Sequence, residues 1–167
     1  MSASEAAVPT VRPARPDDAP RCGDIAVAAW EPVYASFRKM LGDALFELRC
    51  YGWQDGKRRQ VEGHIGQYPD LAIVTELDGQ IVGFLTFRLF PDKSTGEIFN
   101  NAVDPACQGR GVGTLQCEHA LEIFRQAGMK AAAVHTGLDE SHAPARAMYR
   151  NAGFDTSTPE IRYYKAL

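Results

Sequence analysis

The stretch Val103-Asp104-Pro105-Ala106-Cys107-Gln108-Gly109-Arg110-Gly111-Val112-Gly113-Thr114 joins an expected strand to an expected helix through closely spaced glycines. Glycine has no Cβ atom and tolerates positive φ, so backbone N–H groups in such a loop can converge on one anion. The positive end of the dipole of the following helix points at the same place. The stretch therefore predicts a site for a phosphate or pyrophosphate group.

The segments around this loop predict a mixture of strands and helices. Alternating apolar residues between turn signals predict strands, and apolar residues at helical spacing predict helices. The first half of the chain is expected to form a strand at residues 10–13, a helix with Asp17-Asp18 as N-cap that Pro32 interrupts, a helix around 37–48 and a polar helix around 57–65. A hairpin of strands 71–77 and 80–90, joined by Asp78-Gly79, and a strand at 97–103 follow. The expected elements after the loop are a helix that Gly128 ends, a strand at 131–136, a helix at 143–151 closed by Gly153, and an extended segment at 154–166. This order predicts an α+β fold with a mixed, mostly antiparallel sheet flanked by helices.

Length and composition predict one domain. The chain of 167 residues is long enough to bury a single core, and no repeat, low-complexity tract or linker divides it. Residues 1–9 are expected to form a flexible tail before a single domain at residues 10–167. The tail has neither the basic nor the apolar region of a secretory signal, and no apolar run approaches the roughly 18 residues of a membrane span. A cytoplasmic location with no membrane partner is therefore expected.

The charge balance argues against a nucleic-acid partner. Eighteen basic and 21 acidic residues leave a net charge of -3, whereas nucleic-acid binding normally requires a basic face. The only tight basic cluster, Lys57-Arg58-Arg59, is interpreted as a solvated helix face.

Cysteines and histidines predict neither disulfides nor a metal site. The histidines at positions 64, 119 and 135 have no ligand spacing. The cysteines have no C-x-x-C pair and no zinc spacing, and are expected to be reduced, structural thiols. They are Cys22, Cys50, Cys107 and Cys117.

The spacing of residues within the loop fits neither of two common phosphate-binding motifs. A P-loop requires a Lys-Ser/Thr pair after its last glycine, and Gly113 is followed by Thr114 and Leu115 instead. A dinucleotide fingerprint requires a third glycine, which is replaced by Thr114 when read from Gly109 and by Gln116 when read from Gly111. The pattern that remains is Q-x-x-G-x-G.

This pattern, carried by Gln108, Gly111 and Gly113 between a strand and a long helix, resembles the pyrophosphate loop of the GCN5-related N-acetyltransferase (GNAT) family. Residues 11–18 are similar to that family's first strand and helix start, and the hairpin at 71–90 to its second and third strands. Residues 145–154 are similar to its penultimate helix, with A-x-x-x-Y followed by Gly-Phe. The resemblance covers nearly the whole chain. It implies a GNAT-like fold with a central splay in the sheet, and acetyl-CoA as co-substrate.

The resemblance also implies which residues bind acetyl-CoA. The end of the strand before the loop offers its backbone to the pantetheine arm, and the loop takes the pyrophosphate. Seven positions before the tyrosine of the A-x-x-x-Y motif the family often has Asn, and here His142 either reaches the pantetheine, caps a helix or is exposed. These residues are Asn101, Ala102, Val103, Gln108, Gly109, Arg110, Gly111, Val112, Gly113, Thr114 and His142.

Two residues are candidates for catalysis. By resemblance the phenol of Tyr149 lies near the thioester sulfur and protonates the leaving thiolate, and a core aromatic residue is the alternative. Glu97 matches the position of the general base in one branch of the family, and a solvent-exposed glutamate is the alternative. A base is needed because an alkyl amine with a pKa of about 10.4 is almost wholly protonated at neutral pH.

The acceptor is expected to be a primary amine of a small molecule or a peptide, acetylated directly in a ternary complex. The candidate acceptor residues are Trp30, Glu31, Tyr34 and Phe37, although these aromatic residues suit a packed core nearly as well. Cys107 borders the loop, so a covalent acetyl-enzyme stays open.

Two other functions stay open, and so does the end of the sheet. The first alternative is a non-catalytic acyl-CoA-binding or sensing module on the same fold, and the second is a phosphate-ligand enzyme of the Rossmann type. Residues 154–167 have room for one strand, whereas the family usually ends with two. Either the last strand is very short, or a partner subunit completes the sheet in a homodimer.

Overall fold

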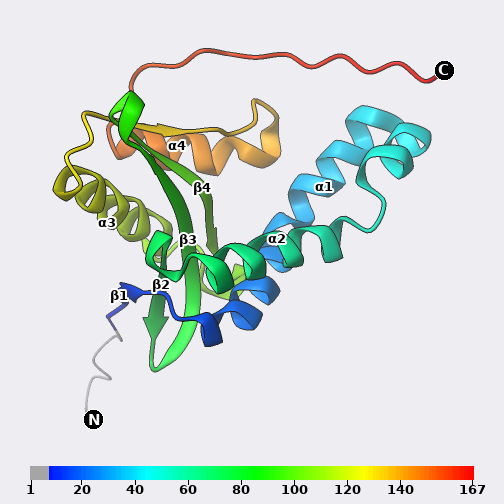
Figure 1. Cartoon of the computed structure of the whole chain (residues 1–167). Coiled ribbons are helices and arrows are strands. Elements are labelled where there is room, and N and C mark those ends of the chain that lie inside the picture. The colour runs from blue at the N-terminus through cyan, green and yellow to red at the C-terminus, as the bar shows by residue number, and fades with distance from the viewer. Residues whose placement is uncertain (1–7) are drawn as a thin grey trace, which may run out of the picture.

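A five-stranded sheet forms the centre of the computed structural model, which describes residues 8–167 (Figure 1). Its spatial order is the chain order, and all neighbouring strands pair antiparallel except the last two, which are parallel. The strands are β1 (Thr10–Pro13), β2 (Ala72–Leu77), β3 (Gln80–Phe90), β4 (Thr95–Val103) and β5 (Ala131–Val134). The predicted mixed, mostly antiparallel sheet is confirmed.

Helices cover both faces of this sheet (Figure 1). They are α1 (Ala19–Cys50), α2 (Trp53–Gln67), α3 (Val112–Gln126) and α4 (Ala143–Asn151). On one face α1 and α2 bury Ile25, Val61 and Ile65 against Phe84 of β3. On the other face α3 and α4 bury a second cluster that includes Phe124. Because successive strand residues point to opposite faces, both clusters draw on the same strands.

The β2–β3 hairpin forms as its turn residues predict. Asp78 and Gly79 have φ values of 51° and 73°. Positive φ at both central residues is the signature of the tight turn whose twist matches that of paired strands.

The predicted interruption of the first helix at Pro32 is wrong. The helix α1 continues through Pro32, and its only non-helical residue is Gly42, with φ 72° and ψ 163°. The break therefore falls at a glycine, because a residue with a Cβ rarely adopts these angles.

The splay expected in the sheet lies between β4 and β5. The two strands pair only over Thr95–Ile98 and Ala131–Val134. Beyond Ile98 the β4 backbone turns toward the loop with no β5 partner in the described part of the chain. Within residues 8–167 the backbone of residues 99–102 therefore has no ladder partner on the β5 side, and the carbonyl of Val103 accepts from Gln108 Nε2 at 3.2 Å.

A β-bulge in β4 changes which residues share a face of the sheet. Thr86 pairs with Asn100 and Phe87 with Ile98, so Phe99 is left out of the ladder. Ile98 belongs to the core under α3 and α4, whereas Ala102 belongs to the core under α1 and α2. Without the bulge, these positions four residues apart would lie on one face.

The residues after α4 do not form the expected strand. Residues 154–167 have no secondary structure, and within residues 8–167 no strand pairs with the outer edge of β5. The segment runs instead from α4 toward the far end of α1, drawn in red in Figure 1, where the Arg49 guanidinium lies 5.2 Å from the ring centre of Tyr164. An extended chain becomes a strand only when its backbone groups find a partner ladder, and residues 155–167 are exposed instead. Of the predicted tail at residues 1–9, residues 1–7 lie outside the described part.

Two cysteines are structural in the expected sense. Cys22 and Cys117 are buried and unpaired, and burial raises the pKa of their thiols to about 12 and about 11. A thiol that stays protonated is a poor nucleophile. No helix of the described residues is long and apolar enough to cross a membrane.

Candidate active site

The glycine-rich loop ends at the N-terminus of α3. Gly111 is the N-cap residue with φ 78°, and no side chain occupies the capping position. The first N–H groups of a helix have no partner within the helix, so those of α3 are available to an anion. On the other side of the loop Asp104 pairs with Arg21 at 2.6 Å and accepts a hydrogen bond from the backbone N–H of Ala106. The loop therefore fits a pyrophosphate group.

A buried glutamine fixes this helix against the sheet. The amide of Gln116 donates to Asn101 Oδ1 at 2.6 Å and to the carbonyl of Phe84 at 3.1 Å, and its carbonyl accepts from Thr75 Oγ1 at 2.9 Å. These bonds join α3 to three strands. They hold the loop at a constant distance from the splayed end of β4.

Asn101 of β4 contacts both α3 and α4, the two helices that cover its face of the sheet. Its side-chain amide donates to the carbonyl of Gly113 at 3.2 Å and lies 3.7 Å from Met148 Sδ in α4. Asn101, the loop and α4 are therefore brought together as expected from the sequence.

Tyr149 lies one residue further along α4 and is 8% exposed. Its ring packs edge-on against Phe154 with the centroids 5.7 Å apart. Burial, reinforced by the Cys117 thiol, raises the pKa of Tyr149 above its ordinary value, while Asn101 acts in the opposite direction. The phenol is therefore protonated at neutral pH. The ring has the core role considered as the alternative, and it also lines a cavity of about 750 Å³ beside β5.

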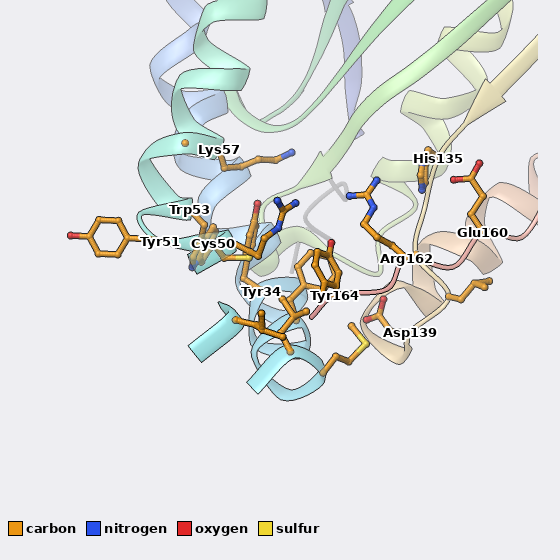
Figure 2. A pocket seen from close by; sticks show the side chains of 18 of the residues that line it. Tyr34, Cys50, Tyr51, Trp53, Lys57, His135, Asp139, Glu160, Arg162 and Tyr164 are labelled. Carbon is orange, nitrogen blue, oxygen red and sulfur yellow. The ribbon is translucent and has the colours of Figure 1, made fainter. Parts of the chain in front are cut away.

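A larger cavity of about 1300 Å³ lies between the end of α1, the start of α2 and the C-terminal segment (Figure 2). Two predicted acceptor residues, Tyr34 and Phe37, line it, and Trp53 stacks on Tyr34 at 4.1 Å. Trp30 and Glu31 are not among its lining residues, and Glu31 is exposed on α1.

The two cavities adjoin each other at the end of β5. They share four lining residues, which are His135, Gly137, Leu138 and Glu160. The cavity that Tyr149 lines therefore adjoins the cavity lined by the aromatic residues of α1 and α2.

Glu97 stands where β4 and β5 are still paired, opposite Arg88 of β3 and Ala133 of β5. Because of the bulge at Phe99, the side chain of Glu97 shares its face of the sheet with Asn100. This is the face of α1 and α2. Glu97 is half-buried and lines neither of the two cavities.

His142 is bound to an aspartate. Its Nδ1 lies 2.6 Å from Asp139 Oδ1, and Ser36 Oγ of α1 donates to Asp139 Oδ2 at 2.8 Å. Burial opposes ionisation of Asp139, but bonds from Ser141, Ser36 and His142 outweigh it and hold the pKa of Asp139 well below its usual range. His142 thus fastens the start of α4 to α1 through Asp139, and its ring also lies 6.1 Å from the ring of Phe37 in α1.

Lys57 is a residue that the sequence interpretation missed. It is half-buried and lines the larger cavity, whereas its neighbour Arg58 pairs with Asp24 on the surface at 2.7 Å. The interpretation of the basic cluster as a solvated face is therefore wrong for Lys57. The signal was available, because Lys57 follows Trp53 by four positions and residues at that spacing lie on one face of a helix.

No group of three or more His, Cys, Asp or Glu side chains in the described residues could hold a metal ion. The geometry thus defines an α+β protein whose sheet opens beside a glycine-capped helix, with a buried tyrosine and an open cavity next to the opening.

Comparison with known proteins agrees with this geometry. The model of the acetyltransferase (GNAT) family matches residues 30–154. The chain belongs to this family.

Among its relatives, a mycothiol acetyltransferase of Thermomonospora curvata is 31% identical over 117 residues, which cover 70% of this chain and 38% of the relative. The [ribosomal protein bS18]-alanine N-acetyltransferase of Escherichia coli is 31% identical over 87 residues, or 52% of this chain and 56% of the relative. The chain thus spans well under two thirds of these relatives.

Solved structures share the fold at low identity. The PaiA N-acetyltransferase of Thermoplasma acidophilum, in complex with coenzyme A, superposes with a TM-score of 0.73 at 12% identity and covers 92% of this chain and 93% of its own. A GNAT family acetyltransferase of Brucella melitensis, in complex with acetyl-CoA, superposes with a TM-score of 0.58 at 21% identity over 94% and 96% of the two chains. The predicted GNAT-like fold is confirmed.

Proposed function

We propose that this protein transfers the acetyl group of acetyl-CoA to a primary amine, directly and within a ternary complex. The observation that carries the proposal is that the two cavities adjoin through four shared lining residues, three of which lie just after β5, where its pairing with β4 ends. An acyl donor held in the splay has Tyr149 on one side and the aromatic cavity on the other. Donor and acceptor then meet without an acetylated side chain between them.

In the proposed reaction the amine nitrogen forms a bond to the thioester carbon, and the carbon–sulfur bond breaks. Glu97 accepts the amine proton, directly or through water, and Tyr149 protonates the leaving thiolate. The bulge leaves the Phe99 backbone outside the ladder, so its N–H group is the proposed donor to the carbonyl oxygen. Glu97 lies on the face of the sheet covered by α1 and α2, and Tyr149 lies on the face covered by α3 and α4, so the proposed base and acid act from opposite faces.

Binding of the co-substrate is the first test. At a concentration of acetyl-CoA about 100 times its Kd, the free energy of unfolding should rise by about 2.7 kcal/mol. For a domain of this size the melting temperature should increase by roughly 5–10 °C, measured by scanning fluorimetry. NAD and ATP should give much smaller shifts, because neither loop pattern is present. Equal shifts from all three ligands would contradict the assignment of the loop.

Replacement of Glu97 by glutamine tests the base. The rate should fall most at neutral pH and recover partly at high pH, where the amine loses its proton unaided. The pH dependence of kcat/KM measures this, and Glu118→Gln, an exposed change on α3, serves as the matched control. An unchanged profile would remove Glu97 from the mechanism.

Asp139 also faces the acceptor cavity, but its lowered pKa makes it a weak base. Asp139→Asn should therefore lower the free energy of unfolding more than it changes the pH profile of the rate.

The non-catalytic alternative makes a different prediction. A sensing module would bind acetyl-CoA and release no thiol with any amine of a panel that includes amino acids, polyamines and peptides. Thiol release with any one amine supports the enzyme instead.

A further inference from the structure

The charged lining of the larger cavity suggests what else its ligand carries. Its lining includes two acidic residues, Asp139 and Glu160, and Asp139 is already engaged by Ser36, Ser141 and His142. It also includes four cationic side chains, which are Arg49, Lys57, Arg59 and Arg162. The cavity therefore has an excess of positive charge, although the whole chain has a net charge of -3.

Lys57 is the cation placed deepest against the sheet. Its Nζ donates to Asn100 Oδ1 at 2.7 Å and to Gln60 Oε1 at 3.0 Å, and it lies 3.7 Å from the ring centre of Trp30. Asn100 is held in turn by its own bond to Thr86 at 2.8 Å. The amino group thus has a fixed position next to the bulge of β4.

These partners are all uncharged. Among the described residues no carboxylate forms an ion pair with Lys57, and burial lowers the pKa of its amino group to about 8. A half-buried ammonium without a counter-ion is unfavourable, and a ligand carboxylate would offset that cost. An ammonium has three N–H donors. The two amide oxygens use two of them and the Trp30 ring lies beside the group, so a ligand carboxylate competes with neutral partners and supplies the charge that they lack.

Figure 2 shows that the side chains of Lys57 and Arg162 extend toward the same space from opposite sides of the cavity. Tyr34 and Trp53 form an aromatic wall beside them. The space is thus suited to a ligand with an anionic group and a flat or apolar side chain.

We propose that the acceptor is an amine that also carries a carboxylate, such as an amino acid or a short peptide, and that Lys57 binds this carboxylate. The inference rests on the proposed function, since it assigns the larger cavity to the acceptor. It excludes polycationic amines as preferred acceptors, because four cationic side chains would repel them.

A matched pair of ligands tests the proposal. N-acetylphenylalanine and N-acetylphenylalaninamide differ only in the carboxylate, and neither has a free amine to be acetylated. Their Kd values at pH 7 are measured by calorimetry, with the fluorescence of the two tryptophans as a second signal, because Trp30 touches Lys57 and Trp53 lines the cavity. The acid should bind wild-type protein about 10- to 100-fold more tightly than the amide, as one charged hydrogen bond is worth.

Three variants assign the preference to Lys57. Lys57→Met should bring the two Kd values within about threefold of each other, and Lys57→Arg should restore part of the difference. Lys39→Met makes the same substitution at an exposed position on α1 that does not line the cavity, and should keep the full preference. If Lys57→Met does not fold, Lys57→Gln replaces it, and the wild-type comparison still tests whether the cavity prefers a carboxylate.

The inference is overturned if wild-type protein binds acid and amide equally, if the acid shows no saturable binding, or if Lys57→Met keeps the preference. Because neither ligand is a substrate, these outcomes do not depend on catalysis. A preference for the acid in a protein that acetyl-CoA does not stabilise would contradict the proposed function and leave the carboxylate site standing. Stabilisation by acetyl-CoA together with equal binding of acid and amide would contradict the carboxylate site alone.

Discussion

Turnover should fall by roughly 10²–10³-fold when Tyr149 is replaced by phenylalanine, the lower part of the range for loss of a general acid. A thiol with a pKa of about 8.5 leaves fairly well unaided, which keeps the loss from being larger. The ring packs against Phe154 and is 8% exposed, and phenylalanine keeps this packing. The free energy of unfolding should therefore change by about 1 kcal/mol or less.

The pH profile supplies a second readout for Tyr149. Burial raises the pKa of its phenol, so the acid form persists as the pH rises through neutrality and beyond its ordinary value of about 10. The wild-type rate should therefore show no decline between about pH 7 and pH 9 from ionisation of this phenol. The profiles of wild type and Tyr149→Phe should have the same shape over this range, at different rates.

Tyr68→Phe is the matched control for this experiment, since Tyr68 is half exposed and lines neither cavity. It should leave both rate and stability unchanged. A purely structural Tyr149 would lose melting temperature and keep its turnover per folded molecule. Wild-type turnover of Tyr149→Phe with any accepted amine would exclude Tyr149 as the acid.

Replacement of Gly111 by valine should weaken acetyl-CoA binding by a factor of about 10² or more, the loss expected for two charge-assisted hydrogen bonds. Gly111 has φ 78° and is the N-cap of α3. A β-branched residue resists this conformation and either changes the direction of the neighbouring N–H groups or puts its side chain among them. The thermal shift with acetyl-CoA should disappear.

Strain alone must be separated from loss of the binding site. Gly128, at the other end of α3, has φ 76°, and at both glycines an added Cβ atom would meet no atom within 4 Å. Gly128→Val therefore introduces similar backbone strain, about 1–2 kcal/mol, away from the loop. Both variants should lose similar stability, and only Gly111→Val should lose acetyl-CoA binding. Equal binding losses in the two variants would show that the effect is general destabilisation.

Much of the fold could be predicted because its signals are local. The turn at Asp78-Gly79, the glycine at the end of α3 and the glycine loop before it each require a backbone conformation that few residue types adopt. These residues place the hairpin, the helix and the loop in order along the chain. The cofactor residues proposed at positions 101–114 are neighbours in sequence around this loop, so one local signal, together with the family resemblance, pointed to all of them.

The acceptor side was less predictable. Tyr34 and Phe37 line the cavity, but Glu31 does not and Lys57 does. A helix pattern shows which residues share a face, and it does not show what that face packs against. Lys57 became a cavity residue because Trp30 and Asn100, both distant in sequence, lie against its amino group.

The sequence by itself determined the class of fold and the phosphate-type loop, because these depend on chemistry within a few neighbouring residues, and the resemblance to the family added Tyr149 as a candidate. The tertiary structure alone decided the bulge at Phe99, and with it the face on which Glu97 lies. It also decided that residues 154–167 run toward α1 without joining β5. Register and pairing depend on how remote segments meet, and one skipped residue in a strand exchanges the two faces of the sheet for every position that follows.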